Sequence, residues 1–137
     1  MPEAATLYDP LRRREVAATP EEQVRQWFIG VLASRGVPMH MMMSEVAMKY
    51  GRKTWRADIV IWGAGGTPMA VTECKRPGVG VSGEVAAQAR RYQSVLGVRF
   101  IFLTNGSETY AYRREGASFV PVGHLPDYTE MTQPCQQ

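Results

Sequence analysis

The chain has 137 residues, of which 45% are hydrophobic and 21% charged, with 16 Lys and Arg against 13 Asp and Glu. This length suits one domain with a buried core, and the composition excludes general disorder. No apolar run approaches the ~20 residues of a membrane helix, and the N-terminus lacks the order of a secretion signal. Cys74 and Cys135 lie too far apart for a disulfide framework. We therefore expect a cytoplasmic protein without a membrane partner.

The net charge of +3 is weak support for a polyanionic partner. The distribution of the charge adds to it, because arginines cluster at residues 12–14, 90–91 and 113–114. Clusters of this kind are about as often plain solvated surface as nucleic-acid contacts. Charge alone therefore does not decide between these two interpretations.

The N-terminal part predicts an arm followed by a helix. Residues 1–18 contain two prolines and read as an irregular arm. Thr19 is a suitable N-cap, and Glu22, three residues later, completes a capping box. Apolar residues then recur at helical spacing until Gly36-Val-Pro38 ends the helix: Val24, Trp27, Phe28 and Val31.

From about residue 40 the apolar period changes to two, which predicts strands. We expect strands at 40–50, 55–62 and 69–75, a helix at about 82–96, and strands at 98–104, 108–113 and 118–122. Short turns favour an antiparallel meander for the first three strands, and the later helix favours a crossover. The sequence thus predicts an α/β fold with a mixed central sheet flanked by helices. The domain would span 19–122, before a loosely ordered tail at 123–137.

One polar group stands out among the predicted strands. Asp58 interrupts the hydrophobic strand Ala57–Ile61, and Glu73 and Lys75 lie fifteen and seventeen positions further along. Side chains alternate along a strand, so Glu73 and Lys75 share one face about 7 Å apart. Unpaired burial of such charges is costly. Either Lys75 makes a structural ion pair, or the two acids hold a hard divalent cation such as Mg²⁺.

The order of these residues resembles the PD-(D/E)XK nuclease superfamily. It is most similar to the N-terminal domain of type I restriction enzyme R (HsdR) subunits and their small stand-alone relatives. Five blocks over about residues 7–114 carry the resemblance: Tyr8–Arg14, Thr19–Gln26, Arg56–Val60, Glu73–Pro77 and Leu103–Gly106. The proline of the superfamily's name is absent, since Arg56-Ala57 precedes Asp58. The resemblance implies a restriction-endonuclease-like αβββαβ core with extra C-terminal strands.

The resemblance also implies a site. Asp58 and Glu73 would bind Mg²⁺, with Mn²⁺ as a substitute, and the backbone carbonyl of Cys74 would add a ligand. Lys75 would orient the attacking water and stabilise charge developing on the phosphate. The first helix would supply a further acid, for which Glu21 is favoured over Glu22 because the capping box already explains Glu22.

The predicted second helix offers Gln88 and Tyr92, one turn apart. A Gln-Xaa-Xaa-Xaa-Tyr pair resembles the motif that shapes the active site of RecB-type members of the superfamily, although Tyr92 also fits a core position. Arg90 and Arg91 suit either phosphate contact or solvent, and Arg56 is a further candidate for nucleic-acid binding.

Three interpretations follow. The first is a Mg²⁺-dependent endodeoxyribonuclease of the restriction or defence type, acting on DNA phosphodiester bonds. The second is a non-catalytic nuclease-like module that binds nucleic acid, a helicase or a restriction-system subunit. The third is a structural module with a satisfied ion pair. The sequence does not determine the cleavage specificity, the strand preference or whether the substrate is DNA or RNA. It also leaves open whether a homodimer forms to cut both strands.

Overall fold

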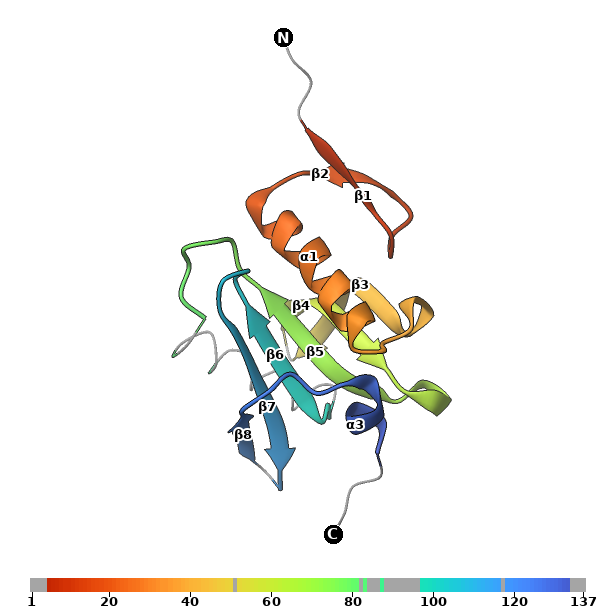
Figure 1. Cartoon of the computed structure of the whole chain (residues 1–137), viewed down its shortest axis with the longest axis vertical. Helices are drawn as coiled ribbons and strands as arrows, with labels where there is room; N and C mark the ends of the chain where they lie inside the picture. Colours follow the sequence, from red (N-terminus) through yellow and green to blue (C-terminus); the bar gives the residue numbers. More distant parts are fainter. Residues whose placement is uncertain are drawn as a thin grey trace.

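A six-stranded mixed sheet organises the computed structural model, which describes residues 5–50, 52–81, 83, 87, 97–116 and 118–133 (Figure 1). The strand order is β3-β4-β5-β6-β7-β8. All neighbouring pairs are antiparallel except β5 and β6, which run parallel. The strands are β3 (Met42–Tyr50), β4 (Lys53–Trp62), β5 (Pro68–Cys74), β6 (Phe100–Thr104), β7 (Thr109–Glu115) and β8 (Ser118–Val122). The predicted fold class and its antiparallel meander β3-β4-β5 are confirmed.

Helix α1 (Pro20–Ser34) crosses one face of the sheet. Its Thr19 N-cap accepts a hydrogen bond from the Glu22 N–H at 3.1 Å, so the predicted start of the helix is confirmed. The side chains of Phe28 and Leu32 are fully buried against the sheet. Two short 3₁₀ helices, η1 (Met39–Met41) and η2 (Ala64–Gly66), lie in the connections that flank β3 and β4.

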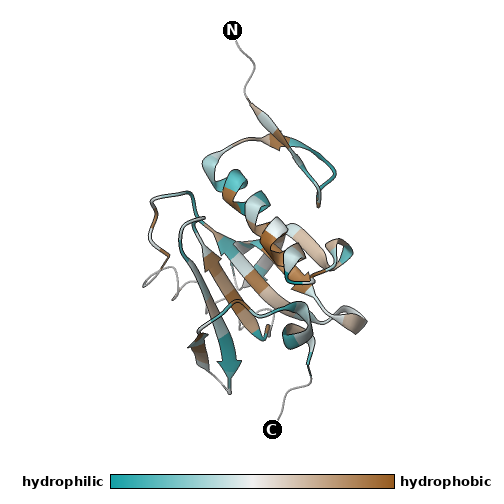
Figure 2. Ribbon diagram, viewed as in Figure 1, coloured by the Kyte–Doolittle hydropathy of each residue, from teal (hydrophilic) through white to brown (hydrophobic). Residues whose placement is uncertain are grey.

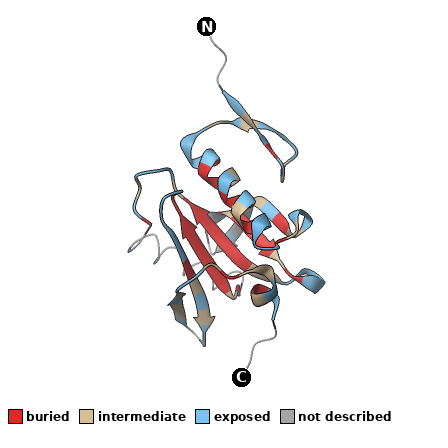
Figure 3. Ribbon diagram, viewed as in Figure 1, coloured by how far each residue is buried: buried red, intermediate tan, exposed pale blue. Residues whose placement is uncertain are grey.

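Each face of the sheet carries its own apolar cluster. The cluster under α1 includes Phe28, Ile59 and Phe102, and the cluster on the opposite face includes Val71 and Leu103. The central strands are therefore buried on both sides (Figure 3). This two-sided burial explains why the sequence of β6 is almost continuously hydrophobic, as Figure 2 shows.

The N-terminal arm predicted as irregular is instead a hairpin of β1 (Thr6–Asp9) and β2 (Arg14–Ala17). Pro10 does not oppose this structure, because it lies in the turn between the two strands. The loosely ordered tail was also predicted wrongly, since it contains helix α3 (Tyr128–Thr132). A capping box between Asp127 and Glu130 starts α3, and the fully buried side chain of Met131 anchors it.

The predicted second helix at about 82–96 lies almost wholly outside the described residues. Gln88, Arg90, Arg91 and Tyr92 lie there too, so their predicted roles stay predictions. In the described part of the chain, no helix is both long enough and apolar enough to cross a membrane.

The packing of α1 predicts unequal effects for two neighbouring aromatic residues. Phe28→Ala should lower the free energy of unfolding by about 3–5 kcal/mol, because it leaves a cavity against Phe102. Trp27→Ala should cost much less, since the Trp27 side chain is 47% exposed. Urea titrations of both variants measure the difference, and equal losses would contradict this packing.

Candidate active site

Asp58 lies where the β4–β5 ladder ends. The last regular pair in this direction is Ile59 with Thr72, so the register places Asp58 beside Glu73 one step further. There the Asp58 carboxylate accepts a hydrogen bond from the Cys74 N–H at 2.6 Å. The Asp58 side chain thus accepts the hydrogen bond that a backbone carbonyl of β4 would accept in a regular ladder. β4 and β5 separate at this carboxylate.

Glu73 and Lys75 follow on β5 and directly after it. The Lys75 ammonium lies 3.2 Å from Glu73 Oε1, so the predicted proximity of these two groups is present as an ion pair. Glu73 alternates with Cys74, which packs in the cluster under α1, and therefore lies on the opposite face of the sheet. The Glu73 side chain is 8% exposed, and its Oε2 atom has no hydrogen-bond partner among the described residues.

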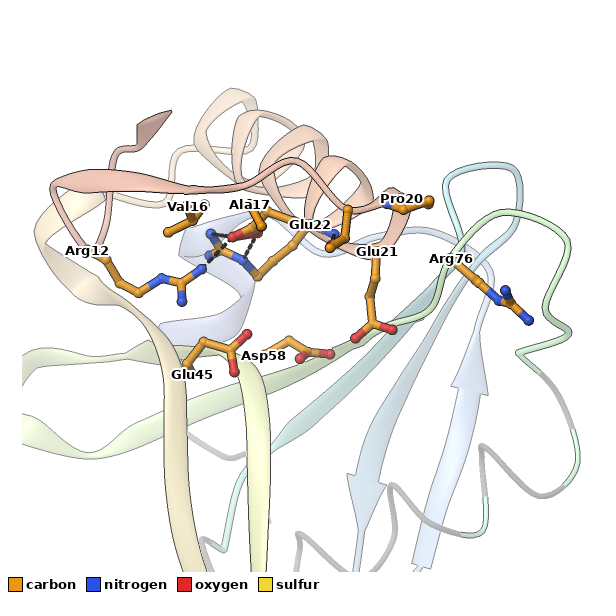
Figure 4. A pocket seen from close by; sticks show the side chains of 11 residues that line it. Arg12, Val16, Ala17, Pro20, Glu21, Glu22, Glu45, Asp58 and Arg76 are labelled. Atoms are coloured by element: carbon orange, nitrogen blue, oxygen red, sulfur yellow. Dashed lines mark hydrogen bonds and ion pairs between the residues drawn. The ribbon is translucent and has the colours of Figure 1, made fainter. Parts of the chain in front are cut away.

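Two further acids reach Asp58 from neighbouring elements. Glu21, in the first turn of α1, lines a cavity of about 520 Å³ together with Asp58 and Glu45. Figure 4 shows the Glu21 carboxylate directed down toward Asp58, with Glu45 on the other side. Between them, α1 and β3 therefore complete an acidic floor around Asp58.

Glu45 was missed by the sequence analysis. The rungs Ser44–Ile59 and Val46–Ala57 flank it, so the register places Glu45 opposite Asp58 at an unpaired position. Its φ of 55° is in the left-handed region, a conformation that costs a non-glycine residue about 1–3 kcal/mol. Its only sequence signal is an acid that breaks the apolar alternation of a predicted strand.

The crowding of these acids changes the protonation of Asp58. Burial is the largest cause that raises the pKa of Asp58, to about 7, and the hydrogen bond from the Cys74 N–H opposes it. The negative charges of Glu73, Glu45 and Glu21 raise the pKa further. A positive charge placed among these groups would reverse the trend, because it favours the ionised carboxylate.

The donor set fits a hard divalent cation. Among the described residues, no three Asp, Glu, His or Cys side chains converge closely enough to form a complete metal cage. Mg²⁺ does not need one, since it uses one or two carboxylates with waters and phosphate oxygens. Asp58 and the orphaned Oε2 of Glu73 supply such oxygens. Burial raises the pKa of the Cys74 thiol, so only the carbonyl of Cys74 is suited to this ion.

A second charged group, next to the acidic floor, is a buried ion-pair network. Arg25, 2% exposed, contacts Glu22 Oε2 at 2.5 Å and Asp9 Oδ2 at 2.8 Å, and also donates to Ser44. Arg12 pairs with both Asp9 and Glu22. Burial raises the pKa of Asp9, but hydrogen bonds from Arg12, the Leu11 N–H and Arg25 outweigh it and hold the pKa below 3.8.

This network corrects one prediction. The Glu22 carboxylate does not return to its N-cap, as a full capping box requires, because two guanidinium groups bind it. Glu22 therefore has a structural role, and Glu21 is the acid that faces Asp58. Sequence reasoning missed Asp9, Arg12 and Arg25 as partners, although the block Tyr8–Arg14 that resembles the HsdR family contains two of them. Arg56, exposed on β4, lies 3.4 Å from Glu45.

Comparison with known proteins agrees with this geometry. The family described as type I restriction enzyme R protein N terminus (HSDR_N) matches residues 20–126. The chain belongs to this family. No curated protein matches it.

The fold of this HSDR_N chain is similar to that of a solved fragment of a protein assigned as the HsdR subunit of a type I restriction enzyme from Vibrio vulnificus YJ016. The TM-score is 0.67 and the sequence identity is 21%. The match covers 82% of this chain but only 24% of the solved one, so this chain spans about a quarter of that structure's length. The resemblance inferred from the sequence blocks is confirmed at the level of family and fold.

The raised pKa of Asp58 predicts that stability falls as pH rises. Between about pH 4 and pH 7 the folded protein keeps the Asp58 proton while the unfolded chain loses it, so the unfolded state binds fewer protons. The free energy of unfolding should then decline by up to about 1.4 kcal/mol per pH unit from this group, and level off above pH 7. Asp58→Asn should remove this decline in urea titrations with EDTA, and identical slopes would contradict it.

The buried network predicts a large effect of one arginine. Arg25→Met should lower the free energy of unfolding by about 3–5 kcal/mol, because it leaves Asp9 and Glu22 buried with uncompensated charge. The control is Arg35→Met, which removes an exposed arginine at the other end of α1 and should change stability little. Similar losses in the two variants would show that the network does not stabilise the fold.

Proposed function

We propose that the chain is a divalent-metal-dependent deoxyribonuclease domain of the PD-(D/E)XK type that acts in a restriction system. The observation that carries the proposal is the end of the β4–β5 ladder, where the half-buried Asp58 carboxylate lies among Glu21, Glu45 and Glu73, and Lys75 pairs with Glu73. A purely structural site gains nothing from four acids gathered at one point, where their charges raise the pKa of Asp58. The arrangement instead suits a cation and a phosphate.

The residues that would hold Mg²⁺ are Asp58 and Glu73, with the carbonyl of Cys74 as a third oxygen donor. When bound there, Mg²⁺ supplies Lewis acidity at the phosphate and makes a water more acidic. The Asp58 carboxylate is already oriented by the Cys74 N–H at 2.6 Å, so it does not need to reorganise on binding the ion. Its neighbour Glu73 has one unpartnered oxygen for the same purpose.

Two other groups complete the chemistry. The Lys75 ammonium is a fixed positive charge that stabilises the negative charge developing on the phosphate. Its pairing with Glu73 holds it at the site until substrate arrives. Glu21 lines the cavity from the first turn of α1 and would orient water on that side. DNA is the substrate that the family membership favours, with restriction-system subunits as partners.

A second candidate is a nuclease-like module that binds DNA or a restriction subunit without cutting. The 3.2 Å contact between Lys75 and Glu73 favours it, because the same contact satisfies both charges without a metal. The two candidates differ in their response to divalent ions. A nuclease site should be stabilised by Mg²⁺ or Mn²⁺, whereas a binding module without a metal site should not respond.

The proposal predicts metal-dependent cleavage of DNA. Purified protein should nick supercoiled plasmid with Mg²⁺ or Mn²⁺ but not with EDTA, and Lys75→Met should slow the reaction by about 10²-fold or more. Asp58→Asn should abolish both cleavage and the Mg²⁺-induced rise in melting temperature.

Glu21→Gln should slow cleavage without changing stability. The matched control is Glu115→Gln, which removes an exposed acid on β7 and should leave cleavage unchanged.

Two outcomes would count against the nuclease. Cleavage that survives Lys75→Met would come from a contaminant or from a different site. Absence of cleavage with every metal, together with a melting temperature that Mg²⁺ does not change, would favour the non-catalytic module.

A further inference from the structure

The cavity at Asp58 has an acidic floor and a basic rim. Glu21, Glu45 and Asp58 form the floor, while Arg12 and Arg76 lie on opposite sides of it (Figure 4). The guanidinium of Arg76 is exposed and directed away from the acids. Such a pattern suits a ligand that brings one phosphate near the floor and other phosphates to the rim.

One wall of the cavity is the β1–β2 hairpin. Arg12, Val16 and Ala17 line the cavity from this hairpin. Side chains alternate along a strand, so Arg14 lies on the same face of β2 as Val16. Arg14 is exposed, and its side chain has no hydrogen bond or ion pair in the part of the chain that the structure describes. It is therefore available to a ligand at the rim.

The hairpin is a fixed element of the cavity. At its turn the Leu11 N–H donates to Asp9 Oδ1 at 2.9 Å, and the Leu11 side chain packs against the cluster under α1. Arg12 ties the same turn to Glu22 in the first turn of α1. Because the backbone of the hairpin is already fixed, only the side chain of Arg14 has to be ordered when it binds a ligand, which favours affinity.

We propose that the β1–β2 hairpin is a nucleic-acid-binding arm, in which Arg14 and, across the cavity, Arg76 bind phosphates that flank the phosphate at Asp58. The assignment rests on the proposed nuclease function. Guanidinium groups bind phosphate oxygens through paired hydrogen bonds, which suits a repeating phosphate backbone. The phosphate backbone of a nucleic acid can cross the acidic floor when a cation neutralises the acids. An acidic protein segment suits the two arginines less well, because its carboxylates lack the regular spacing of phosphates.

The test measures DNA binding in the Lys75→Met background, so that cleavage does not interfere. Fluorescence anisotropy of a labelled short duplex with Mg²⁺, over a series of salt concentrations, gives the Kd and its salt dependence. Arg14→Gln and Arg76→Gln should each raise the Kd several-fold and reduce the slope of log K against log salt by about 0.9. Arg35→Gln, at the far end of α1, removes the same charge and should leave both values nearly unchanged.

The outcomes separate this proposal from the nuclease proposal. The proposal of a nucleic-acid-binding arm is wrong if the wild-type protein fails to bind DNA. It is also wrong if Arg14→Gln and Arg76→Gln weaken DNA binding no more than Arg35→Gln does. Loss of binding in the two rim variants supports the arm even where the wild type cuts no DNA, in which case the nuclease proposal fails alone. Because Arg14 and Arg76 are exposed, unchanged melting temperatures should show that the variants are folded.

Discussion

The buried guanidinium of Arg25 is the interaction on which the arrangement of the other groups depends. It joins Asp9 at the end of β1, Glu22 in the first turn of α1 and Ser44 on β3. With Arg12 the network contains two positive and two negative charges, so its net charge is zero and its burial is tolerated. The orientation of Glu21 depends on this network. The ion pairs of the adjacent Glu22 fix the rotation of the first helical turn, and this rotation directs Glu21 toward Asp58.

A second constraint comes from the sheet itself. β4 and β5 stop pairing after Ile59 and Thr72, and the carboxylate of Asp58 occupies the gap. β3 adapts on the other side, where Glu45 takes a left-handed conformation at the unpaired rung. An opened ladder lets carboxylates from both faces of the sheet approach one point. In complete antiparallel ladders the directly opposed residues Glu45, Asp58 and Glu73 would share one face of the sheet.

Charges of both signs therefore lie near this point. The acids raise the pKa of Asp58, Lys75 pairs with Glu73, and Arg12 and the exposed Arg76 line the same cavity as Asp58. A divalent cation and a phosphodiester together complement such a set of charges better than either does alone. The chain belongs to the HSDR_N family, which relates this arrangement of charges to restriction enzymes. It spans about a quarter of the length of the HsdR structure that it resembles.

The sequence by itself determined the type of most elements and the proximity of Asp58, Glu73 and Lys75, because strand periodicity and the spacing of a motif are local properties. It did not determine the partners of the acids. Thr19 and Glu22 satisfied a local capping rule, yet Glu22 bound arginines that lie three and ten residues away in the chain. The hairpin at 6–17 and the acid at Glu45 were decided only by tertiary structure. Ion pairs between distant segments and an unpaired rung between two strands leave no periodic trace in a sequence.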